Sequence, residues 1–357
     1  MNPRLVSFLF VLLVVIQLSP TLSYPADDHH HYDDDDESPE HWKGATPLKV
    51  PTLSENLPFG DFLSFSHYHR SCPDLERIIN EKMRQWLKQD YSVAASLMRL
   101  HFHDCAVRGC DASILLDHEE SERSALVSKT LRGFEVIDDI KAEVEKKCPK
   151  VVSCADILTA ATRDATVMIG GPYWMVPYGR KDGRVSIAKE AEGVPMGHEN
   201  ITALVELFQS QGLNVLDLVV LSGAHTIGRS SCASIQNRLY NFDGHGNSDP
   251  SIDEKYLNFL KRKCRWGSDY VDLDATTPKA FDTAYYSNLQ RKMGLLKTDQ
   301  LLHSDTRTSP LVTALAHQPA VFYHQFGVSM AKLGNVQVLT GQDEGEIRTN
   351  CNFVNSY

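Results

Sequence analysis

The sequence predicts a mainly α-helical protein, and three observations support this fold class. Seven segments place apolar residues at helical spacing or form long apolar runs. Strand signals are few and short, as at 174–183, and no internal repeat of fixed period occurs. With 357 residues, the chain can bury a substantial core in one to three domains.

Composition argues against some classes of partner. Hydrophobic residues make up 42% of the chain and charged residues 23%, which is ordinary for a soluble globular protein. The formal net charge is −10, and the acidic run at 27–40 contributes to it. This excess of negative charge gives no electrostatic reason to expect nucleic acid or an anionic membrane surface as a partner.

The segment 1–23 has the layout of a secretory signal peptide. Arg4 supplies a basic start, residues 8–18 are apolar, and small residues follow at 21–23. A membrane anchor is the alternative, but the apolar run is short for a bilayer span, and no later segment is long and apolar enough. The sequence therefore predicts a secreted protein of the extracellular space or cell wall, with no membrane association after signal removal.

Residues 24–62 form the next segment, which is polar, acidic and proline-bearing. It shows no sustained periodicity, and this predicts a flexible extension. Three histidines at 29–31 lie beside aspartates and could hold a metal loosely, although a solvated tail is the stronger interpretation. One folded domain is predicted to cover 63–357.

Four helices are predicted in the first half of this domain. Residues 74–90 carry one apolar face and have Pro73 near their start. Residues 92–105 are largely apolar, which indicates a buried helix. Two more helices are predicted at 131–148 and 153–171, and the second of these stops at glycines.

The second half contains three further helical segments. Residues 200–212 have Asn200 as a candidate N-cap, and the same asparagine opens the glycosylation sequon Asn-Ile-Thr. Residues 214–228 begin with a capping-type pair and end in glycine. Residues 309–334 predict two helices that are broken at Pro319.

Eight cysteines lie beyond the signal peptide: Cys72, Cys105, Cys110, Cys148, Cys154, Cys232, Cys264 and Cys351. An even number in a secreted chain predicts a disulfide framework, although spacing alone leaves the pairing open. Zinc binding is the weaker alternative, because the chain has no Cys-x-x-Cys pair.

The stretch Arg-Leu-His-Phe-His-Asp-Cys at 99–105 is the first candidate site. On a helix, Arg99 and His103 are four residues apart and share a face, whereas His101 points elsewhere. The two histidines therefore cannot bind one ion from a regular helix, and we expect His101 to be buried with its ring nitrogens satisfied. A base and a fixed cation over one spot suit proton transfer and stabilisation of negative charge, although ordinary core residues are the alternative.

A second motif strengthens the functional interpretation. Residues 218–228 read Leu-Val-Val-Leu-Ser-Gly-Ala-His-Thr-Ile-Gly, with His225 near the end of an apolar helix. The small residues around this histidine suggest room for a large, flat group. His225 is therefore a candidate ligand of a cofactor.

Together, the two motifs resemble the distal and proximal haem motifs of the class III secretory plant peroxidases, within the haem peroxidase superfamily. The resemblance runs from about residue 63 to the C-terminus, and the motifs occur in the family's order and at its separation. It implies a haem peroxidase fold in which two helical lobes sandwich haem b, with few short strands and four disulfides.

The resemblance implies a role for each candidate residue. His225 would bind the haem iron, and Asp299 would accept the proton of its other ring nitrogen. His103 would move a proton between the two oxygens of hydrogen peroxide, and Arg99 would stabilise the charge that develops. Phe102 would shield the iron from bulky substrates.

The implied function is a secreted, monomeric haem peroxidase. It would reduce hydrogen peroxide and oxidise small phenolic donors in one-electron steps. Pro195 matches a family proline that lines the donor site. The C-terminus lacks the apolar tail that directs some relatives to the vacuole, and this favours the extracellular space or cell wall.

Two calcium ions are implied by the same resemblance, with oxygen ligands that suit a hard cation. The distal ion would be held by Asp104, Val107, Gly109, Asp111 and Ser113, with Glu122 reaching it through water. The proximal ion would be held by Thr226, Asp274, Thr277, Ala280 through its carbonyl, and Asp282. The implied disulfides are Cys72–Cys148, Cys105–Cys110, Cys154–Cys351 and Cys232–Cys264.

The chain departs from the family pattern in the loop 117–131, which is shorter than in most members. An asparagine there normally accepts the ring proton of the distal histidine. Val127 or Ser128 falls at that place, and valine could not accept the proton, whereas serine could. The alternative function is therefore a haem-binding secreted or wall-associated protein with weak turnover.

Overall fold

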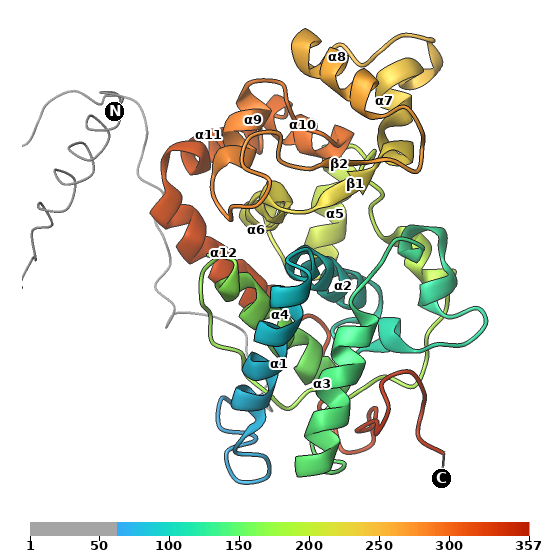
Figure 1. The fold of residues 1–357 in the computed structure, drawn as a ribbon, viewed down its shortest axis with the longest axis vertical. Coiled ribbons are helices and arrows are strands. Elements are labelled where there is room, and N and C mark those ends of the chain that lie inside the picture. Colours follow the sequence, from blue (N-terminus) through green and yellow to red (C-terminus); the bar gives the residue numbers. More distant parts are fainter. Residues whose placement is uncertain (1–62, 357) are drawn as a thin grey trace, which may run out of the picture. The chain divides into compact units, whose positions relative to one another are not determined.

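The computed structural model describes residues 63–356, which form a mainly helical fold (Figure 1). The predicted signal peptide (1–23) and extension (24–62) lie outside the described residues. The α-helices are α1 Leu75–Gln89, α2 Val93–Arg108, α3 Phe134–Lys147, α4 Cys154–Met168, α5 Ile201–Ser210, α6 Val215–Ser222, α7 Gln236–Tyr240, α8 Glu254–Lys263, α9 Ala284–Gln290, α10 Lys297–Ser304, α11 Ser309–His317 and α12 Pro319–Leu333. Strands β1 Arg229–Ser231 and β2 Tyr270–Asp272 pair antiparallel.

The helices pack in two groups. In the first, α4 contacts α1, α2 and α3, and the stretch Cys154–Thr166 of α4 is buried throughout. In the second, α6 contacts α5, α11 and α12, while α9 and α10 pack on α11. Figure 1 shows α7 and α8 beside the two strands, at the end of the domain away from α1 and α3. This arrangement is the mainly helical fold that the sequence predicts.

Most predicted helices are confirmed, with shifted ends. The helix predicted at 131–148 begins at Phe134, because Gly133 before it has φ +103°, a conformation that only glycine adopts readily. The helix predicted at 92–105 continues to Arg108 and stops at Gly109, which has φ +88°. The predicted break at Pro319 separates α11 from α12.

The predicted N-caps are present in α5 and in α6, the helix that carries the start of the second motif. The side chain of Asn200 accepts a hydrogen bond from the backbone nitrogen of Ala203 at 2.9 Å. At the start of α6, Asn214 and Asp217 form a reciprocal capping box. The α-helix ends at Ser222, and the chain continues as a 3₁₀ turn over Gly223–Thr226 that carries His225.

The strand predicted at 174–183 is wrong. Within it, only Tyr178 and Asp182 form isolated bridges, to Ser64 and Glu346. The side chain of Arg180 is buried and binds Asp156 at 2.7 Å, so this segment is held by side-chain contacts rather than by a neighbouring strand. The short helices α7, α9 and α10 were not predicted from the sequence, because each has too few turns for a clear apolar period. The ten-residue helix α8 was also missed.

The four disulfides join Cys72 to Cys148, Cys105 to Cys110, Cys154 to Cys351 and Cys232 to Cys264. This is the pairing that the resemblance implies, and no described cysteine is free. Within residues 63–356, no single helix is long and apolar enough to cross a membrane. The segments Ile201–Ser210 and Val215–Thr226 are long and apolar enough only when they are counted together, and the chain bends by 108° between them.

Candidate active site

Helix α2 brings Arg99, Phe102 and His103 to one face, as their spacing predicts. The guanidinium of Arg99 donates to the carbonyl of Val127 at 2.9 Å and to the hydroxyl of Thr130 at 3.0 Å. These two bonds fix the cation beside the imidazole, which is itself 3% exposed. Phe102 stacks on Phe208 of α5 with ring centroids 6.2 Å apart.

The imidazole of His103 is held in its neutral form. Burial, together with the nearby charge of Arg99, lowers the pKa of His103 to about 3. A neutral imidazole at physiological pH has a free lone pair and can take a proton, which is the property that a general base needs.

The loop that covers this face leaves His103 without a partner at Nδ1. This nitrogen is buried and makes no hydrogen bond with the described residues, and the same holds for the hydroxyl of Ser128. Val127 packs with Ala125 and Val194 in an apolar cluster against Phe102. The structure therefore shows no described side chain in the role of the family's asparagine.

His101 only partly follows its prediction. It is 1% exposed, and its Nε2 lies 3.3 Å from the hydroxyl of Thr159. Its Nδ1, however, has no hydrogen-bond partner among the described residues. The prediction that both ring nitrogens are satisfied therefore holds for Nε2 only. Burial and the charge of Arg180 lower the pKa of His101 to about 3. His101 is a neutral core residue.

His225 is bound to a buried carboxylate. Its Nδ1 lies 2.8 Å from Oδ1 of Asp299, which is 2% exposed. Tyr285 donates to the same oxygen at 2.9 Å, and the backbone nitrogen of Leu296 donates to Oδ2 at 3.1 Å. Burial and the positive charge of Arg99 both act to lower the pKa of His225. The charge and hydrogen bond of Asp299 outweigh them, so the pKa of His225 is raised.

The residues around His225 fit an iron ligand. Because Nδ1 is committed to Asp299, Nε2 is the nitrogen left to bind a metal, and it makes no hydrogen bond with the described residues. The side chain is 35% exposed although Thr226 beside it and Asp299 behind it are buried. Three residues further on, a Cβ at Gly228 would lie 3.0 Å from Ala95 of α2, so the segment that follows His225 lies against the helix of His103.

Gly223, a small residue near His225, does not leave room for a large, flat group as the sequence suggested. A Cβ at Gly223 would lie 2.3 Å from the hydroxyl of Tyr286 and 2.6 Å from Phe322. Glycine is therefore required here because two aromatic rings occupy the space, not because a cofactor does.

Around the loop after α2, a second group of predicted residues comes together. Asp104 accepts hydrogen bonds from the backbone of Ala112 at 3.0 Å and of Ile114 at 3.4 Å, and Asp111 accepts one from Ser113 at 2.9 Å. Burial raises the pKa of Asp104, and the charge of Asp111 adds to this effect.

Glu122 belongs to the same cluster. It is fully buried, both carboxylate oxygens lack a hydrogen-bond partner within residues 63–356, and so does the hydroxyl of Ser113. Burial raises the pKa of Glu122 to about 8, and Asp111 contributes to the rise. Buried carboxylates with unpaired oxygens fit a site for a hard cation.

The proximal group also comes together, at the residue after His225. The hydroxyl of Thr226 lies 3.4 Å from the Ala280 carbonyl, 3.4 Å from Asp282 and 3.5 Å from Asp274. Thr277 donates to Asp282 at 3.1 Å. All these atoms are oxygens, and the convergence of carboxylates, a carbonyl and hydroxyls fits calcium.

Pro195 lies half-buried near the start of α10. Two residues later, the carbonyl of Gly197 accepts a hydrogen bond from Thr298 at 3.2 Å, and Thr298 precedes Asp299 in the chain. Val194, the residue before Pro195, packs in the apolar cluster with Val127 and Phe102. Pro195 therefore lies between that cluster and the start of α10.

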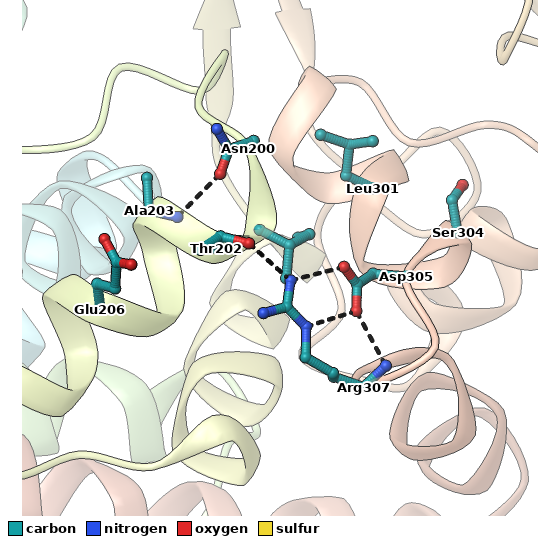
Figure 2. Close-up of a pocket in the computed structure, with 9 residues that line it drawn as sticks. Asn200, Thr202, Ala203, Glu206, Leu301, Ser304, Asp305 and Arg307 are labelled. Atoms are coloured by element: carbon teal, nitrogen blue, oxygen red, sulfur yellow. Dashed lines mark hydrogen bonds and ion pairs between the residues drawn. The ribbon is translucent and has the colours of Figure 1, made fainter.

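A separate groove of about 440 Å³ runs between α5 and the end of α10 (Figure 2). Arg307 crosses it and binds Asp305 at 2.8 Å and the hydroxyl of Thr202 at 3.1 Å. Asn200 lies at one end, with its oxygen turned to the start of α5. No predicted haem or calcium ligand lines this groove.

A neutral buried base beside a fixed guanidinium on α2, together with a carboxylate-bound histidine on the turn after α6, is the arrangement of a haem-dependent peroxidase. Comparison with known proteins agrees with this class. The family model described as Peroxidase matches residues 79–318. The chain is 60% identical to Peroxidase 7 of Arabidopsis thaliana over 302 residues, which cover 84% of this chain and 86% of the relative. It is 44% identical to Peroxidase 1 of the same plant over 317 residues, covering 86% of this chain and 96% of the relative.

The chain belongs to the peroxidase family, within its class III of plant enzymes. It is therefore an enzyme that reduces hydrogen peroxide at the expense of reducing substrates, and the family implies haem as its cofactor. The weak-turnover alternative is not favoured. The shortened loop 117–131 and the extension 24–62 are features that resemble the Peroxidase 7 subgroup of class III, and the 60% identity to Peroxidase 7 agrees with that assignment.

Sequence reasoning missed several residues that support the site. Thr130 and the carbonyl of Val127 hold Arg99, Tyr285 binds Asp299, and Asn288 donates to Asp274 at 2.8 Å. These contacts join segments far apart in the chain, and no local pattern could have revealed them. The adjacent tyrosines at 285 and 286 were the only visible signal.

Proposed function

We propose that this enzyme is a secreted, monomeric haem b peroxidase that uses hydrogen peroxide to oxidise small phenolic donors. The observation that supports it best is the pairing of a neutral, buried His103 with Arg99, whose guanidinium is fixed by two hydrogen bonds. Haem, when bound, supplies the iron that takes oxidising equivalents from peroxide.

His103 moves the proton in this proposal. Its Nε2 takes a proton from one oxygen of hydrogen peroxide and returns it to the other, so that water leaves. The fixed charge of Arg99 stabilises the negative charge that develops on the departing oxygen. Phe102 limits the access of bulky donors to the iron. Small donors react at a separate donor site, which Pro195 lines.

On the other face, His225 is the residue that would hold the iron, through Nε2. Asp299 accepts the proton of Nδ1, which fixes the ring orientation and makes the imidazole a stronger electron donor. Since Asp299 is buried, this hydrogen bond is shielded from water.

Guaiacol, a small phenol, tests the proposed donor class. We expect steady oxidation of guaiacol by the haem-loaded enzyme in the presence of hydrogen peroxide, with turnover that saturates in both substrates. The measurement is the rate of coloured product per haem, with haem occupancy determined from the Soret band. A stoichiometric Soret band without guaiacol turnover would contradict the phenolic-donor proposal.

Two calcium ions are proposed at the clusters around Asp104 and Thr226. Each cluster adjoins a haem-facing residue in the chain, because Asp104 follows His103 and Thr226 follows His225. We expect that calcium removal by a chelator shifts the haem spectrum and lowers the melting temperature, and that added calcium reverses both changes. An unchanged spectrum in protein shown by elemental analysis to lack calcium would contradict this proposal.

Secretion is proposed from the signal-like segment 1–23 and from the four disulfides, which form in oxidising compartments.

The sequence has a single glycosylation sequon, at Asn200, and this residue and Thr202 are both exposed. The Asn200 oxygen caps α5, whereas Nδ2, the atom that would carry a glycan, makes no hydrogen bond with the described residues (Figure 2).

We therefore expect protein produced in a plant secretory pathway to carry a glycan on the peptide that contains Asn200. Mass spectrometry of that peptide before and after glycosidase treatment measures the occupancy. The Asn200→Asp variant keeps a capping oxygen and loses the sequon, whereas Thr202→Ser keeps the sequon. A secreted wild-type protein with no glycan at this peptide would contradict the glycosylation, and retention inside the cell would contradict secretion.

A further inference from the structure

One oxygen of Asp299 serves two donors. His225 binds Oδ1 through Nδ1 at 2.8 Å, and Tyr285 donates its hydroxyl proton to the same atom at 2.9 Å. The other oxygen, Oδ2, accepts a hydrogen bond from the backbone of Leu296 at 3.1 Å. The carboxylate that activates the proximal histidine is therefore shared with a phenol.

The phenol is fixed in place. Tyr285 is the second residue of α9 and is 2% exposed. Its ring meets the His225 imidazole edge-on, with centroids 6.1 Å apart and an angle of 81° between the planes. Burial and the charge of Asp299 raise the pKa of Tyr285 well above its usual value, so the hydroxyl remains a donor.

A second hydrogen bond to the same oxygen weakens the first one. A hydrogen bond from Tyr285 withdraws negative charge from Oδ1, so that Oδ1 attracts the Nδ1 proton of His225 less strongly. The imidazole then keeps more of its neutral character and donates less electron density to a bound metal. The effect is not diluted by water, because Asp299 and Tyr285 are both buried.

We infer that Tyr285 is a positioning residue that limits electron donation from His225 to the haem iron, by competing with His225 for Oδ1 of Asp299. This inference rests on the proposed role of His225 as the iron ligand. It assigns to α9 a part in setting the iron's reduction potential, in addition to the part that α10 plays through Asp299.

The test is Tyr285→Phe in the haem-loaded enzyme, which removes one hydroxyl and keeps the ring. We expect the stretching frequency of the iron–histidine bond, read by resonance Raman spectroscopy of the ferrous enzyme, to rise. We also expect the ferric to ferrous ratio at a fixed potential to increase by about threefold to tenfold, the range expected for one net hydrogen bond. A tenfold change corresponds to about 59 mV for a one-electron couple.

The sign of the change separates this role from a merely structural one. If Tyr285 only held Asp299 in place, its loss would loosen the bond to His225, so the frequency would fall and the potential would rise. Either that result or no change in both readouts would overturn the inference. If the wild-type enzyme shows no iron–histidine band at all, the proposed ligation by His225 fails instead.

Tyr286→Phe is the matched control. Tyr286 is the next residue, is equally buried, and donates to the carbonyl of Val219 at 3.1 Å rather than to Asp299. We expect it to leave the frequency and the potential unchanged. In an Asp299→Asn background, Tyr285→Phe should lose its effect on both readouts, because the shared carboxylate is gone. A full effect in that background would also contradict the inference.

Discussion

Replacement of His103 by leucine is expected to slow the reaction with hydrogen peroxide by about 10²–10⁴-fold, the usual contribution of general acid–base catalysis, while haem still binds. Leucine is similar in size but cannot take the proton. Haem binding should persist, because the proposed iron ligand is His225, on a different segment of the chain. Stopped-flow absorbance at known haem content measures the bimolecular rate constant.

His101→Leu is the control for this variant. His101 is also buried and lies two residues away on α2, but its Nε2 lies within hydrogen-bond distance of Thr159 and it does not share the face of Arg99. We expect this change to lower stability through the lost hydrogen bond and to leave the peroxide reaction close to the wild-type rate. Rapid peroxide reduction by His103→Leu would remove His103 from the mechanism.

Val127→Asn is expected to raise the rate of the peroxide reaction by about tenfold, a part of the range of about 10²–10⁴ available to acid–base catalysis. Nδ1 of His103 is buried and has no hydrogen-bond partner within residues 63–356, so none of these residues holds a proton on that nitrogen. If the proton moves to Nε2, the nitrogen that should act as the base is blocked. An asparagine oxygen at 127 would accept the Nδ1 proton and fix the active tautomer.

Ser128→Ala is the companion variant. The hydroxyl of Ser128 is also buried and unpartnered among the described residues, so alanine in its place tests whether serine substitutes for the missing asparagine. We expect no slowing, measured by stopped flow as for His103→Leu. A slower Ser128→Ala enzyme, or an unchanged Val127→Asn enzyme with full haem, would contradict the tautomer argument. Melting temperatures check that asparagine in the apolar cluster of Val127 does not unfold the loop.

The distal face could be predicted from the sequence, because helical periodicity places Arg99, Phe102 and His103 together whatever surrounds them. The contact between His225 and Asp299 could not be predicted from periodicity. His225 and Asp299 are 74 residues apart, and only the family resemblance related them before the structure placed them 2.8 Å apart. The two groups of calcium ligands were likewise only implied by the resemblance. The structure added that the carboxylate oxygens of Glu122 have no hydrogen-bond partner among the described residues.

The missed features share a physical cause. The strand predicted at 174–183 failed because alternation of residue types does not reveal whether a neighbouring strand exists to complete the hydrogen bonds. The hydrogen bond of Tyr285 to Asp299 could not be predicted, because a buried tyrosine in a short helix has the same local pattern whether its hydroxyl binds a carbonyl or a carboxylate. Tyr286, one residue later, binds a carbonyl.

The Cys154–Cys351 bridge has a practical consequence for anyone who produces this enzyme. It closes 197 residues of chain, and the chain-entropy account assigns about 5 kcal/mol of stabilisation to a loop of that length, as much as many domains have in total. A bacterial cytosol keeps thiols reduced, so recombinant chain made there should accumulate as insoluble, cofactor-free material. A yeast or plant host that exports the chain through an oxidising organelle is the sensible choice.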